Sequence, residues 1–219
     1  MIIKALVAAR SGSVRVQNKN MRPFAGSTLL QIKLEQLKRI PNLDGVILNS
    51  NDEEMLELGR SLGCEVVKRD QYYASNTVSM SDVYVNMAEN CDCDVIAYIN
   101  CTNPLLKDDT IIKAIQKYEK LIEEGFTSLN SAHLIKEFLF ENNLPINYDL
   151  RNQPRSQDLP DIAALNFAIS IISREEMIKS RNVVGIRPYI YLIDEIEATD
   201  IDNPIDFEFA EFVYRKGQW

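Results

Sequence analysis

The first twenty residues constrain the fold more than any other stretch of the chain. Residues 2 to 8 read IIKALVA and are apolar except for Lys4. An almost unbroken apolar run of this length is typical of a strand that is buried on both faces of a parallel sheet. The opening of the chain therefore predicts an α/β protein that begins with such a strand.

A small, cationic loop follows this strand. Ser11-Gly12-Ser13 forms a turn whose backbone N–H groups can approach an anion closely, and Arg10, Arg15 and Lys19 surround it with positive charge. A strand that ends in such a loop has what the binding of a polyphosphate requires. The loop matches neither the Walker A pattern nor G-x-G-x-x-G. The alternative interpretation is a solvated basic surface loop.

Strand and helix patterns alternate through the first half of the chain. This rhythm predicts a mostly parallel sheet with right-handed crossovers and helices on both faces, and ligands bind such sheets at the carboxyl ends of the strands. The predicted strands are 45–49, 64–67 and 95–99, and the predicted helices are 28–39, 52–62, 81–90 and 108–124, with a polar loop through 72–77.

The rhythm changes after residue 126. Residues 127–132 and 137–141 are predicted as strands around a turn, and 142–160 is polar with little periodicity. We interpret 127–160 as an excursion from a single domain that spans residues 1–219; the alternative is a loop that folds back on its own core. Further strands are predicted at 165–172 and 185–192, and a closing helix at 203–215.

Composition excludes several classes of protein. A formal net charge of −8 argues against a nucleic-acid-binding surface, which needs a basic face. No apolar run is long enough to span a membrane and no signal peptide is recognisable, so we expect a cytoplasmic protein without a membrane partner. Four cysteines, two of them in the tight Cys91-Asp92-Cys93 spacing, are interpreted as free thiols.

A second group of candidate residues precedes the last helix. Asp200 and Asp202 alternate, so both carboxylates face one way in an extended chain, as a Mg²⁺ site shared with a nucleotide phosphate needs. The competing interpretation makes Asp202 the N-cap of the helix that begins with Asn203-Pro204. Asp206 is interpreted as a charge in the first turn of that helix.

The opening stretch resembles the pattern A-x-R-x-G-S-x-R-x-x-x-K-N of the acylneuraminate cytidylyltransferases, which make CMP-sialic acid and CMP-Kdo. The matching residues are Ala8, Arg10, Gly12, Ser13, Arg15, Lys19 and Asn20. The resemblance implies a three-layer α/β/α nucleotidyltransferase fold. It also implies that Asp200 and Asp202, which match an S-I-D-I-D-like stretch, bind a catalytic magnesium ion.

Three further segments resemble this family with departures. Arg69 and Ser79 lie where the family reads cytosine and ribose, and Asn100 and Thr102 lie where it has Q-P-T-S-P-L-R, with Asn103 in place of the serine. Near the acceptor, Arg155, Gln157 and Asn166 match R-R-Q-D-L-P and R-P-N-G-A. There, Ser156, Ala164 and Phe167 replace an arginine, another arginine and a glycine.

The resemblance implies transfer of CMP from CTP to an acidic sugar, with release of pyrophosphate. Arg10 and Lys19 would bind the triphosphate and face solvent without it, Arg15 would contact phosphate or a neighbouring loop, and Asn20, Arg69 and Ser79 would hold cytidine. The alternatives are a different anionic acceptor, such as a phosphonate, and a nucleotide-binding module without turnover. The excursion, with Lys136, Arg151 and Arg155, implies a homodimer whose subunits lend cations to each other's acceptor site.

Overall fold

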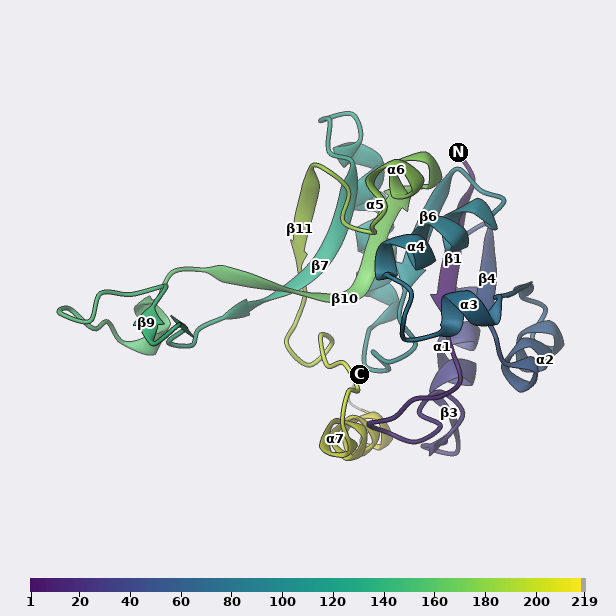
Figure 1. Ribbon diagram of the computed structural model, residues 1–219, viewed down its shortest axis with the longest axis horizontal. Helices are drawn as coiled ribbons and strands as arrows, with labels where there is room; N and C mark the ends of the chain where they lie inside the picture. Colours follow the sequence, from purple (N-terminus) through teal and green to yellow (C-terminus); the bar gives the residue numbers. More distant parts are fainter. Residues whose placement is uncertain (218–219) are drawn as a thin grey trace.

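A mixed seven-stranded sheet forms the centre of the computed structural model, which describes residues 1–217 (Figure 1). The strand order is β11-β7-β10-β6-β1-β4-β5, and β10 alone runs antiparallel to both of its neighbours. The strands are β1 (Ile3–Ala8), β4 (Gly45–Ser50), β5 (Glu65–Lys68), β6 (Val95–Ile99), β7 (Ser128–Ile135), β10 (Ile162–Ser173) and β11 (Pro188–Leu192). The predicted mostly parallel sheet is confirmed.

Helices cover both faces of the sheet, as the alternating pattern predicts. The larger core joins α1, α2 and α5 to one face, and a second core joins α4 and α6 to the other. The helices are α1 (Leu29–Lys38), α2 (Glu53–Ser61), α3 (Gln71–Ala74), α4 (Met80–Glu89), α5 (Asp108–Leu121), α6 (Arg174–Ser180) and α7 (Pro204–Arg215). The three-layer α/β/α arrangement is therefore confirmed.

The first strand lies where the chain reverses its direction of travel across the sheet. From β1 the chain builds β4 and β5 on one side and then crosses to place β6 on the other. Leu6 in β1 pairs with Ile47 in β4 and with Tyr98 in β6, all in parallel register. The loops that follow β1 and β6 consequently meet at one edge, which is where ligands bind in such sheets.

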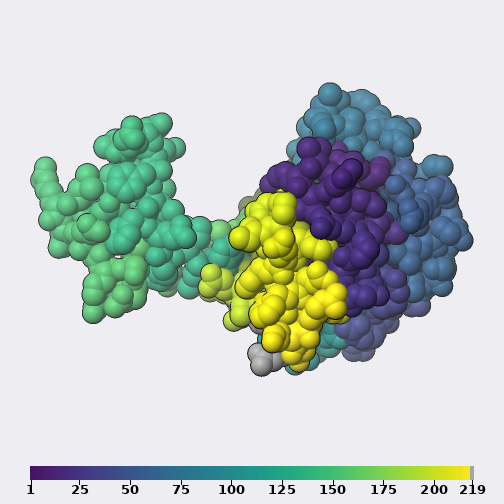
Figure 2. Space-filling view, turned by 90° about the horizontal axis from the view of Figure 1, so that it is seen from below, coloured from purple at the N-terminus to yellow at the C-terminus, as the bar shows by residue number. Residues whose placement is uncertain are grey.

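The last helix closes the molecule beside the opening loop. A third core packs Phe207 and Ala210 of α7 against Val16 and Phe24 from the N-terminal segment. Figure 2 shows the yellow C-terminal segment, which contains α7, lying against the purple N-terminal segment. The two short strands β2 (Pro23–Phe24) and β3 (Ser27–Thr28) belong to the same segment.

Residues 136–161 form a protrusion that stands away from the sheet at the end of the β7–β10 ribbon (Figures 1 and 2). The alternative that this segment folds back on its own core is therefore wrong. Its regular structure is the hairpin of β8 (Phe140–Glu141) and β9 (Leu144–Pro145) and the 3-10 helix Ser156–Asp158. A strand over 137–141 was too long a prediction, because only two of those residues pair.

The remaining differences from the sequence predictions are local. Helix α3 occupies part of the expected polar loop, β11 begins at Pro188 rather than at Gly185, and α6 was not predicted. All four cysteines are free, as expected. No helix within residues 1–217 is long and apolar enough to cross a membrane.

Candidate active site

The loops after β1 and β6 enclose a cavity of about 280 Å³ at the carboxyl edge of the sheet. The end of β1, the glycine turn and the cations of the opening stretch thus surround one space. The cavity is lined by Ala8, Arg10, Gly12, Ser13, Val14, Arg15, Val16, Lys19, Asn20, Asn100, Cys101, Thr102 and Asp202. The structure therefore brings together most of the residues predicted for the nucleotide side.

Hydrogen bonds to the rest of the molecule fix the first part of the loop. Asn51 accepts from the Ser11 N–H and donates to the Ser11 hydroxyl, while Asn20 donates to the carbonyl of Arg10. Gly12 has a φ of +81°, a conformation that glycine adopts without the steric cost of a side chain. The turn is therefore held open, with the Gly12 and Ser13 backbone at the cavity wall.

Arg15 and Lys19 converge on Asp202. Arg15 Nη2 lies 2.8 Å and Lys19 Nζ 3.7 Å from the same oxygen, Asp202 Oδ1. Lys19 also donates to the carbonyl of Ile201, and its side chain is only 16% exposed. The expectation that Lys19 faces solvent is wrong, because the segment before α7 covers it. The expected inter-loop contact of Arg15 is confirmed.

Asn203, and not Asp202, caps α7. The Asn203 side chain accepts from the N–H groups of Ile205 and Asp206, and the Asp206 carboxylate accepts from the N–H of Asn203 to complete a capping box. The cap interpretation of Asp202 is therefore wrong by one residue. The Asp202 carboxylate does not cap the helix; it lines the cavity and contacts Arg15 and Lys19. The prediction that Asp206 is a charge in the first turn of the helix is confirmed.

Asp200 carries a buried carboxylate with an unused oxygen. Its Oδ1 is buried and has no hydrogen-bond partner, although the Thr102 side chain bonds to the carboxylate. Burial raises the pKa of Asp200 and the neighbouring Asp202 raises it further, against the opposing effects of Thr102 and Lys19. A buried, unpaired carboxylate oxygen is unfavourable unless a cation or a donor completes it.

Asp200 and Asp202 fit a magnesium ion that also binds phosphate. Among residues 1–217, no group of three or more His, Cys, Asp or Glu side chains is arranged as a metal site. Mg²⁺ in nucleotide-binding sites needs only one or two carboxylates, because substrate phosphates and water supply the other oxygens. The unpartnered Asp200 Oδ1 is the donor that such an ion would complete.

A second cavity of about 340 Å³ adjoins the first and shares Ala8 and Arg10 with it. Arg69 lies in its wall, buried, with its guanidinium donating to the side chain and the carbonyl of Asn49. Burial lowers the pKa of Arg69. Arg10 donates to the carbonyl of Ala74 and to Asn76 Oδ1, 2.7 and 2.9 Å away. Polar groups beside a space of this kind suit a nucleoside.

Two aromatic residues of this second cavity were missed by the sequence analysis. Tyr73 comes from α3 and Tyr98 from β6, and both line the cavity. Tyr98 lies within a fully apolar strand pattern, so only its sheet register with Leu6 reveals which space it faces.

The predicted cytidine residue Ser79 does not line this cavity. It caps α4 by accepting a hydrogen bond from the Asp82 N–H, and its neighbours Val78 and Met80 line the cavity instead.

A bulge in β10 carries the acceptor-side residue Asn166. The pairing of β10 with β7 is interrupted between Leu165 and Ser170. Inside the bulge, Asn166 Oδ1 accepts from the Ser131 hydroxyl and the Ala168 N–H, and its buried Nδ2 has no partner. Asn100 donates to the carbonyl of Phe167, so the bulge is tied to the loop after β6.

Arg155 and Gln157 do not meet the other site residues within one chain. Both lie in the protrusion, where Arg155 is exposed and pairs with Asp158 at 2.8 Å. The lining of the two cavities contains neither residue.

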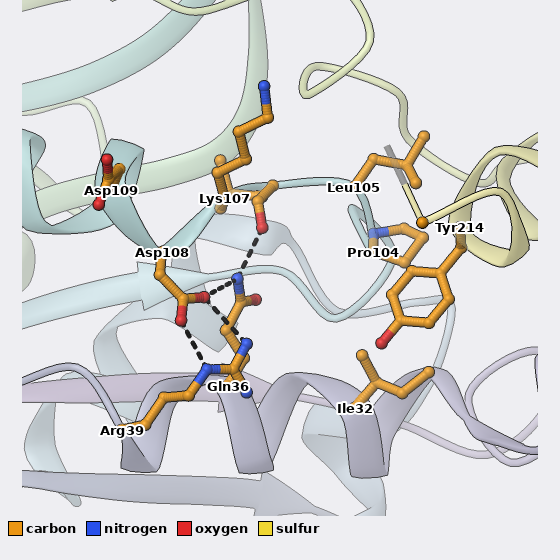
Figure 3. Close-up of a pocket in the computed structure, with 11 residues that line it drawn as sticks. Ile32, Gln36, Arg39, Pro104, Leu105, Lys107, Asp108, Asp109 and Tyr214 are labelled. Carbon is orange, nitrogen blue, oxygen red and sulfur yellow. Dashed lines mark hydrogen bonds and ion pairs between the residues drawn. The ribbon is translucent and has the colours of Figure 1, made fainter. Parts of the chain in front are cut away.

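The largest cavity, about 620 Å³, lies elsewhere, between α1, the start of α5 and the end of α7 (Figure 3). Its polar side chains already satisfy one another: Arg39 pairs with Asp108 at 2.5 Å, and Gln36 donates to Asp108 at 2.9 Å. None of the residues predicted for the site lines it. The two cavities that share Ala8 and Arg10 therefore remain the candidate site.

The sequence model described as cytidylyltransferase matches residues 4–213 of the chain. The chain belongs to the cytidylyltransferase family. The predicted resemblance to the acylneuraminate members is confirmed by two relatives. A pseudaminic acid cytidylyltransferase of Campylobacter jejuni is 29% identical over 96% of this chain and 95% of its own length. An N-acylneuraminate cytidylyltransferase of Oncorhynchus mykiss is 27% identical over 95% of this chain and 49% of its own length.

A solved structure of this cytidylyltransferase's fold contains nucleotide. It is that of CMP:2-keto-3-deoxy-manno-octonic acid synthetase complexed with CTP, with a TM-score of 0.73, 13% identity, and coverage of 99% of this chain and 100% of the other. At this identity the likeness concerns the fold. It agrees with the layered architecture.

Proposed function

We propose that this protein transfers CMP from CTP to an acidic sugar of the nonulosonic acid type and releases pyrophosphate. The observation that carries the proposal is the gathering of Arg10, Arg15, Lys19 and Asp202 around one cavity that adjoins a second cavity through Ala8 and Arg10. Asp200, with its unpartnered oxygen, lies two residues before Asp202. The named relatives that act on pseudaminic and N-acylneuraminic acid support the choice of acceptor class.

The chemistry is an in-line displacement at the α-phosphorus. An acceptor hydroxyl oxygen attacks the α-phosphorus, the bond from the α-phosphorus to the oxygen that bridges to the β-phosphorus breaks, and pyrophosphate leaves with that oxygen. The proton of the hydroxyl passes to solvent water. Arg10, Lys19 and the N–H groups at Gly12 and Ser13 would hold the triphosphate in place and stabilise the charge on the leaving pyrophosphate. Mg²⁺ held by Asp200 and Asp202 would supply further neutralisation of phosphate charge.

Pyrophosphate release with CTP and a panel of acidic sugars tests the proposal. The panel includes pseudaminic acid, N-acetylneuraminic acid and 2-keto-3-deoxy-manno-octonic acid, with a phosphonate as a different anionic acceptor. We expect Mg²⁺-dependent release with at least one nonulosonic acid and almost none from Asp202→Asn. Release with the phosphonate alone would move the acceptor to another class, and CTP binding without any release would indicate a module that lacks turnover.

The protrusion supports a homodimer as part of this proposal. Phe140, Leu144, Ile146 and Leu150 are more than half exposed there, and large exposed apolar groups gathered on one segment are typical of an interface. We propose that a two-fold partner covers this surface and receives Lys136, Arg151 or Arg155 near its acceptor site. Light scattering at micromolar concentration tests the assembly, and a monomer would refute it.

Mixing two inactive variants tests whether the cations cross to the partner. If Arg155 serves the partner's site, equal mixing of Arg155→Ala and Asp202→Asn chains should regenerate about a quarter of the sites, because half of the dimers are mixed and each has one intact site. If Arg155 serves its own subunit, mixing restores nothing. The prediction of a cytoplasmic location stays a prediction.

A further inference from the structure

A fully buried lysine lies in the middle of α1, outside the proposed machinery. Lys33 is 0% exposed and shares the inward face of the helix with Leu29, Leu30, Leu34 and Leu37. Its Nζ donates to Gln36 Oε1 at 2.6 Å and to the carbonyl of Asn103 at 3.1 Å. Both acceptors are uncharged. Burying an ammonium group is costly, and an apolar side chain at the same place would avoid the cost.

The acceptor of Lys33 lies at the turn that leaves β6. This turn enters the active site through Thr102, which lines the cavity, and continues into the buried Asn103. Gln36, the other partner of Lys33, donates to the carbonyl of Leu106 at 2.6 Å and to Asp108 at the start of α5 (Figure 3). Lys33 and Gln36 together therefore fasten the turn to α1 on both sides of Pro104.

The same turn holds the backbone around Asp200. The Asn103 side-chain amide donates to the carbonyl of Thr199 at 3.0 Å and to that of Ala198 at 3.4 Å. On the other side of Asp200, the N–H of Ile201 donates to the carbonyl of Thr102 at 2.9 Å. A chain of hydrogen bonds thus runs from Lys33 through the turn to the residues that flank Asp200.

We propose that Lys33 is a positioning residue that fixes the Thr102–Asn103 turn and, through it, the backbone that presents Asp200 and Asp202. The expected effect of Lys33 on turnover rests on the proposed function. Its expected effect on the backbone around Asp200 rests on the hydrogen bonds alone.

Lys33→Met tests the proposal, since Met keeps the length and unbranched shape of the side chain and removes its donors. The first measurement is amide hydrogen exchange of residues 198–203 in the protein without metal or nucleotide. We expect exchange there to accelerate at least about tenfold, with the strands β1 and β4 unchanged. Unchanged exchange across 198–203 would overturn the proposal.

The second measurement separates positioning from general stability. Removal of the costly buried amine and loss of its two hydrogen bonds oppose each other, so Lys33→Met should change the melting temperature little. Yet kcat should fall about tenfold while CTP affinity without Mg²⁺ stays within about twofold. Leu34→Ala, in the same helix and without a polar contact, should lower the melting temperature and leave the relative protection of 198–203 unchanged. If Leu34→Ala accelerates exchange there as strongly, the effect is one of packing and the proposal fails.

Asn103→Ser keeps the test decisive if Lys33→Met does not fold. It removes the side-chain amide that reaches Ala198 and Thr199, so it should accelerate the same exchange. In the double variant the two effects should be less than additive, because both act through one turn; full additivity would contradict the proposal. If the wild type releases no pyrophosphate, the proposed function fails, and hydrogen exchange alone decides the role of Lys33.

Discussion

Replacing Asp200 by Asn should make the protein more stable without ligands and inactive with them. The buried Oδ1 of Asp200 has no partner. Asn would leave an unpartnered atom at the same place, but an unsatisfied buried group costs more when it is charged than when it is neutral, and we take that difference as about 1–3 kcal/mol. The uncharged amide of Asn removes the buried charge while keeping the side-chain shape. In a domain of this size the gain corresponds to a rise in melting temperature of about 2–12 °C.

The pH dependence of this gain has a definite sign. Burial raises the pKa of Asp200 in the folded protein above that of the unfolded chain, which is about 4. The wild type therefore loses stability relative to the Asn variant as the pH rises from about 4 through the raised pKa, and the deficit stays constant above it. Well below pH 4 the carboxyl is protonated in both states, so its charge no longer distinguishes the two proteins.

Thermal unfolding with and without Mg²⁺ and CTP is the assay. A ligand at about a hundred times its dissociation constant adds about 2.7 kcal/mol, so the wild type should overtake the variant when both are present. Asp202→Asn is the matched control: its exposed ion pair with Arg15 is worth about 0–1 kcal/mol, so it should not stabilise the protein. A ligand-free Asp200→Asn protein that melts below the wild type at neutral pH would refute the reasoning.

Three other predictions follow from single contacts. Lys19→Met and Arg10→Ala should each lower kcat/KM for CTP in steady-state assays, by an amount that corresponds to a loss of about 2–4 kcal/mol of transition-state stabilisation. Undiminished turnover in either variant would contradict the triphosphate assignment. Asn203→Ala should cost about 1 kcal/mol in urea unfolding because Asn203 caps α7, and equal losses for Asp202→Ala would point to a shared cap. Burial lowers the pKa of Lys33 to about 7, so wild-type stability should rise from pH 7 toward pH 10. That rise should be absent in Lys33→Met.

The nucleotide side of the site could be predicted because it depends on local order along the chain. The apolar run of β1 fixes a buried strand, and the cations that follow it within ten residues must lie at its carboxyl end. Thr102 follows β6, and the crossover rules place β6 beside β1. Two elements and one topological rule therefore bring Arg10, Lys19 and Thr102 to one cavity.

Properties decided by tertiary contacts could not be predicted in the same way. The direction of β10 is one, because an apolar run has no polarity that distinguishes parallel from antiparallel pairing. The burial of Lys19 depends on the segment before α7, which is far away in sequence. The burial of Lys33 is a third such property. A lysine on an apolar helix face is expected from the sequence to reach solvent, yet the structure buries Lys33 completely.

The acceptor side departs from the family pattern at a position where backbone conformation matters. Phe167 stands where the resembled motif has glycine, and its φ is +54°, a conformation that is uncommon and costly for a side chain of this size. The bulge that contains it is nevertheless held by the Asn100 hydrogen bond to its carbonyl and by the contacts of Asn166 with Ser131. These contacts impose the left-handed backbone on Phe167 whatever its side chain, and its ring packs with the core that also contains Tyr73 and Val78. A glycine at this position would leave space where the ring now lies. One difference between this chain and the family pattern therefore lies in the volume beside Asn166, on the proposed acceptor side and away from the opening loop, and we expect it to influence the choice of acceptor.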